Sequence, residues 1–448
     1  MTPKGEGLAA EITSREKIAY GCGDLSSNLM WGLTSSYLMF YYTDIYGIAP
    51  QAVAWILLLA RIFDAFCDPA IGWFVDRAGG KVIPRLIRTL ALPYGITGIL
   101  CFLPLPLSPE GKIVWAALSY IVFGAVYSCI NTPYGALSTM IARAVPDRVD
   151  LNAYRLMGCQ LGQFCVASLT IPVITLLGGG GSVAQRQVGM AIFVLLLGIV
   201  GSGLWWLVAR VCVVRYPSGP ARHDMRLILR GLGRNLPWWL CNALVFCQFV
   251  GIATLYGFVL YYVRAVLHGD DQLGGTVLTV ATVMGFVGAV LCPMATRRAG
   301  VLRVALLATG MQVVTFALLY GLPSLSLPLF FALLVPVALA QGIMSPLFYV
   351  LLAATIDERE RHGEGGTAGI AYSINTLVSK LSMGVTGFIL AQFLAFGHYD
   401  AAASIIPPTT TAWIVAGFVL LPLLGNLLQF GLLLVMLNLR NASVRSLT

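Results

Sequence analysis

Long apolar segments recur along the whole chain, and short polar connections separate them. Each segment reaches or exceeds the roughly 17–25 residues that an α-helix needs to cross a bilayer. The pattern predicts twelve membrane helices, at residues 20–43, 51–75, 84–106, 112–141, 151–178, 187–212, 236–263, 274–295, 302–322, 327–355, 367–396 and 410–438. The apolar runs are continuous and do not alternate, which excludes a transmembrane barrel. We therefore expect an all-α membrane protein.

The composition agrees, because 58% of the 448 residues are hydrophobic and 10% are charged, with a mean hydropathy of +0.84. Soluble proteins carry about 25% charged residues. The net charge of +9 is concentrated in alternate connections, for example at Arg226, Arg230 and Arg234. Since Lys and Arg gather in cytoplasmic loops, this asymmetry places both termini in the cytoplasm. Membrane topology explains the basic excess, so no nucleic-acid partner is expected.

The longest polar connection lies near the middle of the chain and separates six apolar segments from six. Short sequences recur 218 to 221 positions apart: Tyr41–Asp44 at Tyr261–Arg264, Asp76–Gly79 at Arg297–Gly300, and Ala153–Tyr154 at Ala371–Tyr372. Their shared offset indicates an internal duplication. Two six-helix repeats are the architecture of major facilitator transporters, whose substrate site lies between the halves near the midplane. We expect a cytoplasmic N-terminal segment (1–19), an N-terminal six-helix bundle (20–212), a cytoplasmic linker (213–235), a C-terminal six-helix bundle (236–438) and a cytoplasmic tail (439–448).

A polar sequence, GWFVDRAGGK at residues 72–81, follows the second apolar segment. It has the form of the loop between helices 2 and 3 of the major facilitator superfamily. In this interpretation Asp76 accepts hydrogen bonds from helix-end amides or a basic partner. Arg77 and Lys81 face the cytoplasm, and we assign these three residues to charge balance or gating. The alternative is a basic loop that only follows a helix.

The second apolar segment carries three charged residues, Arg61, Asp64 and Asp68. Their spacings of three and four place them on one stripe of a helix. Charges at the bilayer centre cost about 2.5–3.5 kcal/mol each, so those present usually act. The two carboxylates offer oxygen ligands to Na⁺ or Li⁺, or their burial and mutual repulsion let one carry a proton. Arg61 would balance the charge when the cation leaves, and a network that only pins helices is the alternative.

Further polar residues lie inside other apolar segments. Asn28, Tyr127 and Asn131 are candidates for a substrate site, since Asn amides both donate to and accept from sugar hydroxyls. The alternative for the Asn residues is to hold helices together by hydrogen bonds. Arg155 is either a substrate ligand or an anchor at the cytoplasmic surface. Lys380 lies well inside its segment, where a lone cation is costly and indicates function.

The residues that other classes of membrane protein need are missing. All four histidines fall in connections or at segment ends, which argues against a His-dependent membrane acyltransferase. No glycine-rich nucleotide loop with Lys is present, which excludes an ATP-driven pump. No filter-like element of a channel is visible. The sequence thus favours a transporter and not an enzyme.

The chain resembles the glycoside–pentoside–hexuronide:cation symporters, which include the melibiose carrier and the bacterial glucuronide carrier. The resemblance rests on the runs YGCGDLSSNL, YLMFYYTDIYGI, ARIFDAFCDP, NTPYGALS, NAYR and INTLVSK and covers nearly the whole chain. It implies that Asp64 and Asp68 bind the coupling cation, with Ser128 as a hydroxyl ligand beside them. It also implies that the following residues line the sugar site or connect it to the cation: Asn28, Tyr127, Asn131, Arg155, Tyr349, Asn375, Thr376 and Lys380.

Departures from the melibiose-type pattern bear on the substrate and the cation. Asn28 and Asn131 stand where that type has acidic residues, which is more similar to the glucuronide and pentoside carriers. Cys67 stands where that type has Asn, and a thiol is a poor ligand for a hard cation such as Na⁺. We therefore expect H⁺ coupling, with Na⁺ as the alternative, in which case Asp64 and Asp68 are the metal ligands. No other cofactor is expected.

A charge count over the candidate site favours an acidic sugar. Asp64 and Asp68 stand against Arg61, Arg155 and Lys380, which gives −2 + 3 = +1. A positive cleft attracts an anion, so a glucuronide or hexuronide is the expected substrate. Neutral pentosides, xylosides or galactosides are the near alternative. From other classes, a lysophospholipid carrier or a sugar sensor without transport would use the same fold. We expect a monomer in the bacterial cytoplasmic (inner) membrane whose partners are the glycoside, a monovalent cation and the lipid bilayer.

Overall fold

The computed structural model describes residues 12–78, 80–142, 145–179, 182–216, 233, 235–322, 326–361, 368–401, 403 and 406–445. Within them all regular structure is helical, as the apolar pattern predicts. The N-terminal half comprises α1 (Ser14–Phe40, continued by the π-turn Tyr41–Ile45), α2 (Pro50–Ala78), α3 (Ile83–Cys101, after the 3-10 turn Gly80–Val82), α4 (Pro109–Ile141), α5 (Val145–Gly178) and α6 (Val183–Val211). The C-terminal half comprises α8 (Leu236–Ala265), α9 (Asp271–Ala299), α10 (Val301–Gly321), α11 (Leu327–Arg361), α12 (Ala368–Phe396) and a last rod made of α13 (Pro408–Val415), a π-turn (Ala416–Leu420) and α14 (Leu421–Arg445).

The described residues thus form twelve long helical rods, one for each predicted segment. Nine of them, α4 to α6 and all six of the C-terminal half, are long and apolar enough to cross a membrane. The prediction overruns its helix most at the end of α3, which stops at Cys101 and not at residue 106. Pro104 and Pro106 follow in quick succession, and proline lacks the N–H that a continuing helix needs.

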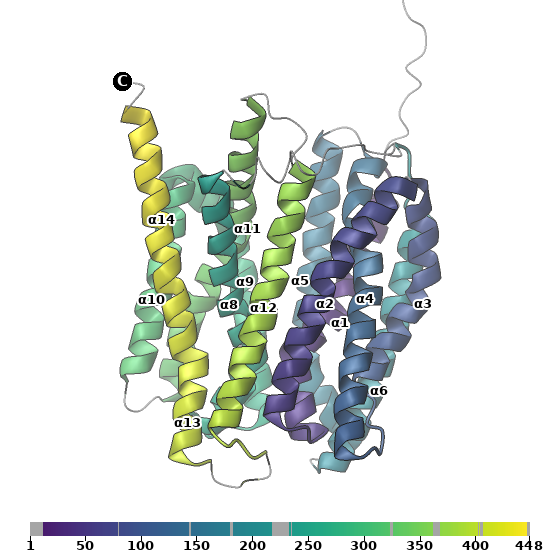
Figure 1. The fold of residues 1–448 in the computed structure, drawn as a ribbon, viewed down its shortest axis with the longest axis vertical. Coiled ribbons are helices and arrows are strands. Elements are labelled where there is room, and N and C mark those ends of the chain that lie inside the picture. Colours follow the sequence, from purple (N-terminus) through teal and green to yellow (C-terminus); the bar gives the residue numbers. More distant parts are fainter. Residues whose placement is uncertain are drawn as a thin grey trace, which may run out of the picture.

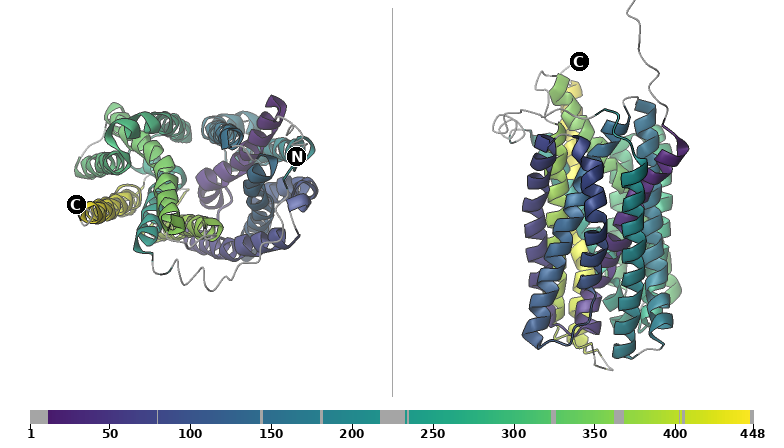
Figure 2. Two further views of the ribbon diagram at one scale, coloured as in Figure 1. Left: turned by 90° about the horizontal axis from the view of Figure 1, so that it is seen from above. Right: turned by 90° about the vertical axis from the view of Figure 1, so that its right-hand side faces the viewer.

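The rods form two groups side by side, as the view from above shows (Figure 2). Within the first group α1 packs on α5 and α6, and α3 packs on α4 and α6; within the second α11 packs on α9 and α10, and α8 on α12 and α14. Across the boundary α2 contacts α12, α5 contacts α9, and α1 contacts α8. α1 begins and α14 ends at the same end of the molecule, at the top in Figure 1. The other end is called the opposite end below.

Inside each half, some helices touch through their backbones. A Cβ added at Gly158 of α5 would lie 2.2 Å from the carbonyl oxygen of Gly21 in α1. A Cβ added at Gly342 of α11 would lie 1.8 Å from the carbonyl oxygen of Gly285 in α9. Only glycine permits such close approach, as in other membrane helix pairs. These two contacts, called the glycine contacts below, fix α1 on α5 and α9 on α11.

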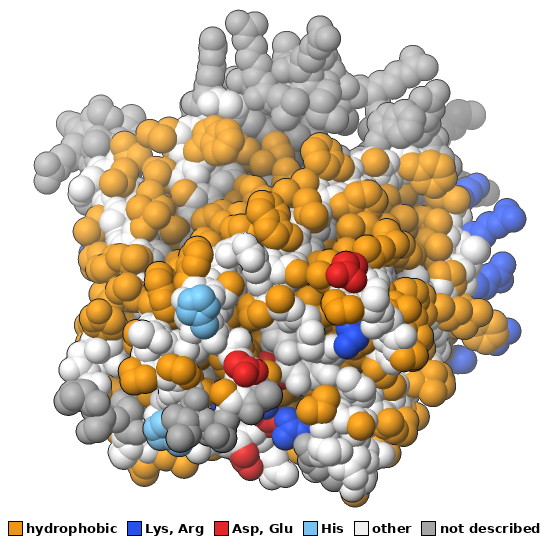
Figure 3. All heavy atoms as spheres, turned by 60° about the horizontal axis from the view of Figure 1, so that its bottom comes forward, with side chains coloured by type: hydrophobic (Ala, Val, Ile, Leu, Met, Phe, Trp, Pro, Cys, Tyr) orange, Lys and Arg blue, Asp and Glu red, His pale blue; other side chains and the backbone are white. Residues whose placement is uncertain are grey.

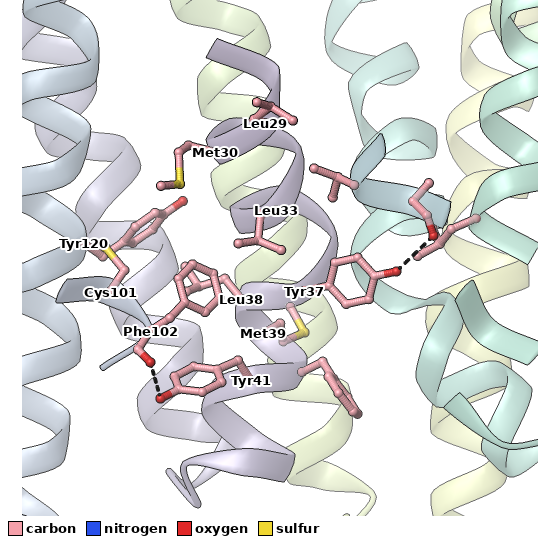
Figure 4. Packing of buried hydrophobic residues seen from close by; sticks show 14 of the residues in the cluster. Leu29, Met30, Leu33, Tyr37, Leu38, Met39, Tyr41, Cys101, Phe102 and Tyr120 are labelled. Carbon is pink, nitrogen blue, oxygen red and sulfur yellow. Dashed lines mark hydrogen bonds between the residues drawn. The ribbon is translucent and has the colours of Figure 1, made fainter. Parts of the chain in front are cut away.

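Large side chains fill the space around α1. Figure 4 shows Leu29, Leu33 and Tyr41 of this helix packed against residues of neighbouring helices. The hydroxyl of Tyr41 donates to the carbonyl oxygen of Phe102 at 2.8 Å, just after α3 ends. The early end of α3 therefore supplies a partner for a buried tyrosine, which would otherwise be costly to bury.

Charged residues near the start of α1 hold the end that carries the termini. The buried carboxylate of Glu16 accepts from both terminal nitrogens of Arg215 at 2.8 Å and from the Val213 amide at 2.9 Å. The hydrogen bond with Glu16 raises the pKa of the Arg215 guanidinium above its ordinary value. This cluster ties the chain that leaves α6 back onto α1.

Candidate functional site

Arg61 and Asp64 of α2 are buried together inside the N-terminal half, with exposed fractions of 5% and 3%. Arg61 donates to Asp64 at 3.1 Å and to the hydroxyl of Tyr120 in α4 at 2.8 Å. The guanidinium also lies over the ring of Trp31 in α1, 4.2 Å from its centroid. A carboxylate, a hydroxyl and an aromatic face thus hold the Arg61 charge.

One oxygen of Asp64 has no hydrogen-bond donor. Its Oδ1 is fully buried and unpaired among the described residues, while Oδ2 accepts from Arg61. This oxygen faces Gly124 of α4, where an added Cβ would lie 2.4 Å away. An unsatisfied buried carboxylate oxygen is costly, and it is a natural place for a proton or cation to bind.

Asp68 is paired across the boundary between the halves. Lys380 of α12 donates to Asp68 Oδ2 at 2.5 Å and to the hydroxyl of Ser128 in α4 at 3.3 Å. The hydroxyl of Thr132 donates to the other oxygen of Asp68 at 3.4 Å. The Lys380 ammonium group therefore lies at two of the residues that the sequence assigned to the coupling cation. Asp64 and Asp68 have separate basic partners and do not share one in this structure.

The backbone of α12 comes very close to α2 one turn further along. A Cβ at Gly384 would lie 2.5 Å from the Cβ of Arg61. Gly384 follows Lys380 by four residues and therefore lies on the same helix face. The same face of α12 thus carries the lysine that reaches Asp68 and the glycine that makes room for Arg61.

Arg155 of α5 also has an acidic partner, one that the sequence analysis did not single out. Its guanidinium donates to Asp24 of α1 at 2.6 Å and 3.4 Å and lies over the ring of Tyr134, 4.9 Å from the centroid. Asp24 could have been found by the criterion applied to Asp64, since it is an acidic residue within the first helix. The pair joins residues 131 positions apart, which no local spacing reveals.

Asp24 changes the charge balance of the site. The acidic residues are now Asp24, Asp64 and Asp68, and the basic ones are Arg61, Arg155 and Lys380, which gives −3 + 3 = 0. The excess of +1, on which the expectation of an acidic sugar rested, is therefore absent from these three ion pairs. Each cation in the set already has a carboxylate partner.

The two candidate asparagines of the N-terminal half take part in hydrogen bonds between helices. Asn28 donates to the carbonyl oxygen of Asp24 at 2.8 Å and accepts from Gln163 of α5 at 3.3 Å. Asn131 of α4 accepts from Ser27 of α1 at 3.2 Å. Both amides are therefore held in place by neighbours, and Gln163 links Asn28 to the cavity described below.

Tyr127 and Asn375 also contact their neighbours. The ring of Tyr127 stacks on Trp31 with centroids 5.1 Å apart, and Trp31 in turn lies against the Arg61 guanidinium. Asn375 of α12 donates to the side chain of Asn242 in α8 at 3.2 Å. Asn242 is a second residue that the sequence analysis missed.

The remaining candidates are more exposed or lie outside the described side chains. Tyr349 of α11 is 58% exposed, and Thr376 of α12 is exposed as well. Lys81 is exposed in the short turn before α3. The predictions for Asp76 and Arg77 fall on side chains outside the described part of the structure.

A cavity of about 450 Å³ lies between the halves. Its size falls within the roughly 300–1,000 Å³ of small-molecule sites. Trp31, Tyr349 and Asn375 line it, and so connect it to the residues above. The other polar residues that the structure describes in its lining are uncharged: Ser35, Ser36, Gln160, Gln163, Gln248, Tyr256, Thr282, Gln341 and Ser345. Such a lining suits a polyhydroxylated, uncharged ligand better than an ion.

Ion pairs join the two halves at the opposite end. Arg264, at the end of α8, pairs with Asp44 of the first π-turn and with Asp271 of α9 at 2.8 Å. Arg186 of α6 donates to the other oxygen of Asp271 at 2.5 Å. The hydroxyl of Tyr399 donates to Asp44 at 2.8 Å. We call these five residues the polar seal, and their charges sum to −2 + 2 = 0.

A hydroxyl pair adds to the polar seal. Thr43 and Tyr261 lie 2.7 Å apart through their side-chain oxygens, one from each half. Figure 3 brings the opposite end forward and shows a few acidic, basic and histidine side chains within a largely apolar surface. In the described structure, the halves are thus joined here by charged and hydroxyl groups.

Among the described residues, no three His, Cys, Asp or Glu side chains come together as a metal site. The residues at Asp68 instead offer carboxylate and hydroxyl oxygens, which suit a proton or a small hard cation. A family model described as MFS/sugar transport protein matches residues 19–440. The chain belongs to this family.

Membership confirms the resemblance seen in the sequence and shows a multi-pass transporter that is not an enzyme. The inner membrane symporter YicJ of Escherichia coli is 28% identical over 94% of this chain and 91% of its own. The glucuronide carrier protein homolog of Escherichia coli is 29% identical over 92% and 91%. The isoprimeverose transporter of Lactiplantibacillus pentosus is 27% identical over 86% and 81%. Two of these relatives thus bear names with different sugars.

Solved structures confirm the major facilitator fold of the family. A D-xylose–proton symporter superposes with a TM-score of 0.67 at 13% identity, covering 94% of this chain and 97% of its own. A bacterial homologue of the iron transporter ferroportin in an inward-facing state gives a TM-score of 0.66 at 14% identity, covering 94% and 98%. At such identities the likeness concerns the fold alone.

Proposed function

We propose that this protein is a cation-coupled symporter that imports a neutral glycoside, with Asp64, Asp68 and Ser128 as the cation site. The observation that carries the proposal is the position of Lys380. Its ammonium group contacts Asp68 and Ser128 from the other half of the molecule. In the proposal, Lys380 takes the place of the coupling cation when the site holds none.

Cation binding then changes the boundary between the halves. When a proton or Na⁺ neutralises Asp68, the attraction that holds Lys380 to α2 is lost, and α12 is free to move relative to α2. Asn375, five residues before Lys380 on α12, lines the cavity, so this movement reaches the sugar site. Cation and sugar must each raise the affinity of the other by the same factor. Alternating access follows when both are bound.

We favour a proton as the coupling cation. Asp64 Oδ1 is buried with no donor among the described residues, and it can take up a proton without further ligands. Na⁺ needs several oxygen ligands, and Cys67 offers sulfur near these acids. Arg61 balances the charge of Asp64 when the proton leaves.

A neutral glycoside is favoured over the hexuronide that the sequence suggested. The charges of the three ion pairs sum to zero, and none of their six residues lines the cavity. The cavity offers amides and hydroxyls that can bond to sugar hydroxyl groups. The isoprimeverose transporter and the glucuronide carrier homolog are both relatives, so a test must separate neutral from acidic sugars.

The same features bear on the orientation in the membrane and on the oligomeric state. The end that carries the termini is taken as cytoplasmic, which makes the polar seal periplasmic and the described state closed to the outside. All proposed site residues come from one chain, so a monomer suffices. The relative YicJ is named as an inner membrane symporter, and we propose the same membrane here.

Uptake measurements in a host without its own carriers test the function. Neutral xylosides should accumulate against a gradient, and their uptake should alkalinise the medium. Glucuronides should compete poorly with them for uptake. Glucuronide uptake far above xyloside uptake would overturn the neutral substrate. Stimulation by a Na⁺ gradient at fixed pH, without alkalinisation, would overturn proton coupling. Sugar binding without any flux would indicate a sensor and overturn transport itself.

A further inference from the structure

The C-terminal half carries a connected set of buried glutamines at the cavity. Gln341 of α11 and Gln248 of α8 line the cavity, and Gln429 of α14 lies behind them. Their exposed fractions are 7%, 2% and 0%. Buried amides are costly unless they are hydrogen-bonded, so a connected set of them calls for a physical explanation.

Hydrogen bonds connect Gln429 and Gln248 to the backbone of Gln341. Gln429 donates to the side-chain oxygen of Gln248 at 3.4 Å, and Gln248 donates to the backbone carbonyl of Gln341 at 3.4 Å. Gln248 is therefore held at both its donor and its acceptor. The chain of amides runs from α14 through α8 to the backbone of α11, and it supports that backbone where the Gln341 side chain borders the cavity.

The side-chain amide of Gln341 is left without a partner. Among the described residues none donates to its oxygen or accepts from its nitrogen, although the side chain is more than nine-tenths buried. Its Nε2 lies against α8, 3.0 Å from where a Cβ on Gly251 would be. A supported but unpaired amide beside an uncharged cavity is a group prepared for a ligand that both donates and accepts.

The facing wall in the N-terminal half has matching unpaired groups. The hydroxyl of Ser35 in α1 is buried without a partner, and it lines the same cavity. Gln160 of α5 also lines the cavity and has no hydrogen-bond partner in the described structure. These groups lie on the other side of the boundary between the halves from Gln341.

We propose that Gln341, supported by Gln248 and Gln429, forms a second sugar subsite that binds the polar second unit of a two-unit glycoside. The inference rests on the proposed function and names its substrate class. The first sugar ring lies toward Trp31 and Asn375, next to the ion pairs. The second ring lies against α11 and α8, where its hydroxyls bond to the Gln341 amide. The carrier therefore prefers disaccharide-type glycosides over single-ring glycosides.

The test compares one-ring and two-ring ligands on Gln341→Met, which keeps the length of the side chain and removes the amide. The probes are methyl β-D-xyloside and xylobiose and, for a carrier of acidic sugars, methyl glucuronide and the glucuronosyl-xylose disaccharide. Calorimetric titration of the purified full chain measures affinity. We expect Gln341→Met to weaken two-ring binding by roughly 10–100-fold, as loss of a buried hydrogen bond does. One-ring binding should change by less than about three-fold.

A matched glutamine controls for burial and folding. Gln312 of α10 is 2% exposed, has an unpaired side-chain nitrogen and does not line the cavity. Gln312→Met should leave the preference for two rings unchanged. If Gln341→Met does not fold, Gly251→Ala displaces the amide without removing it, and the same selective loss is expected to a smaller degree.

The outcomes separate this inference from the proposed function. Equal losses for one-ring and two-ring ligands, or losses no larger than those of Gln312→Met, would overturn the subsite while leaving transport intact. A wild-type protein that prefers one-ring ligands would also overturn it. A wild-type protein that binds no glycoside, either at low pH or with Na⁺, would contradict the proposed function itself, and the subsite with it.

Discussion

Asp44 and Arg264 lie 220 residues apart at matching places of the two repeats, and they form an ion pair with each other. Each follows a pair of tyrosines, Tyr41-Tyr42 and Tyr261-Tyr262, near the end of the first long helix of its half. The fold brings these two matching positions face to face at the opposite end. One now carries an acid and the other a base, so that the repeated positions attract and hold the halves together.

Loss of this pair should open the polar seal. Arg264→Gln leaves Asp44 with the hydroxyls of Tyr399 and Thr43 and without its cation, so the closed state loses a charge-assisted contact. We expect a reagent that cannot cross the membrane to label Cys159, which lines the cavity, about ten-fold faster from the periplasmic side. This corresponds to about 1.4 kcal/mol taken from the closed state. The measurement uses variants in which Cys159 is the sole cysteine.

Arg88→Gln is the control for this experiment, because Arg88 is an exposed arginine on α3. It should leave the labelling rate of Cys159 at the wild-type value. A rate that rises equally in both variants, or in neither, would show that the polar seal does not hold the described state closed.

Neutralising Asp68 should uncouple transport. Asp68→Asn removes the partner of Lys380 and a ligand of the proposed cation site, so uptake can no longer be driven by the cation gradient. We expect the ratio of internal to external sugar to fall to about 1, as it must without coupling. Exchange of labelled for unlabelled sugar in vesicles should persist.

Asp150→Asn provides the comparison, since Asp150 pairs with Lys17 at the end that carries the termini. It should accumulate sugar as the wild type does. Concentrative uptake by Asp68→Asn would refute the assignment of this residue to the cation.

A methyl group at Gly124 should disturb the cation site although no charged residue is replaced. The new Cβ would lie 2.4 Å from Asp64 Oδ1, so the carboxylate must move from its place beside Arg61. Overpacking of this kind costs about 1–3 kcal/mol. We expect Gly124→Ala to lose the shift in melting temperature that low pH or Na⁺ produces in the wild type.

Gly135→Ala on the same helix is the control for this change, because a Cβ there meets nothing within 4 Å. It should keep the cation-dependent shift. The role of Asp64 Oδ1 would be contradicted by a Gly124→Ala protein whose melting temperature still responds to the cation.

The pair of Asp24 and Arg155 should behave as a unit. Arg155→Gln leaves the Asp24 carboxylate, 13% exposed, without its cation. We expect a loss of roughly 1–3 kcal/mol in the free energy of unfolding, less than for a fully buried pair because the Arg155 side chain is 25% exposed. The double variant Asp24→Asn/Arg155→Gln should recover most of this loss in thermal unfolding. Additive losses would show that the two residues act independently.

The sequence predicted the helices well because each has its own signal. Apolar runs separated by polar connections mark every rod, and the misplaced end of α3 traces to two prolines whose effect is local. The stripe of Arg61, Asp64 and Asp68 was equally visible, since helical spacing alone puts three charges on one face. These features depend on residues near one another in the chain.

The partners in the site could not be predicted in the same way. Lys380 meets Asp68 across 312 positions, and Arg155 meets Asp24 across 131, so only the packing of helices brings them together. The glutamines of the cavity escaped notice for another reason. An amide carries no charge, and nothing in the local pattern distinguishes Gln341, which borders the cavity, from Gln312, which does not.

The glycine contacts inside each half bear on how fast such a protein can work. Backbones that touch at Gly158 and Gly342 leave no side chain to reorient, so α1 with α5, and α9 with α11, must travel as fixed blocks. The bonds that change during a cycle are then those of carboxylates, guanidinium groups and hydroxyls at the boundary. Water replaces such bonds at little cost as they part. Turnover of the carrier therefore leaves these paired helices intact and exchanges one set of polar partners for another, while apolar contacts such as that of Trp55 with Phe388 part at the boundary.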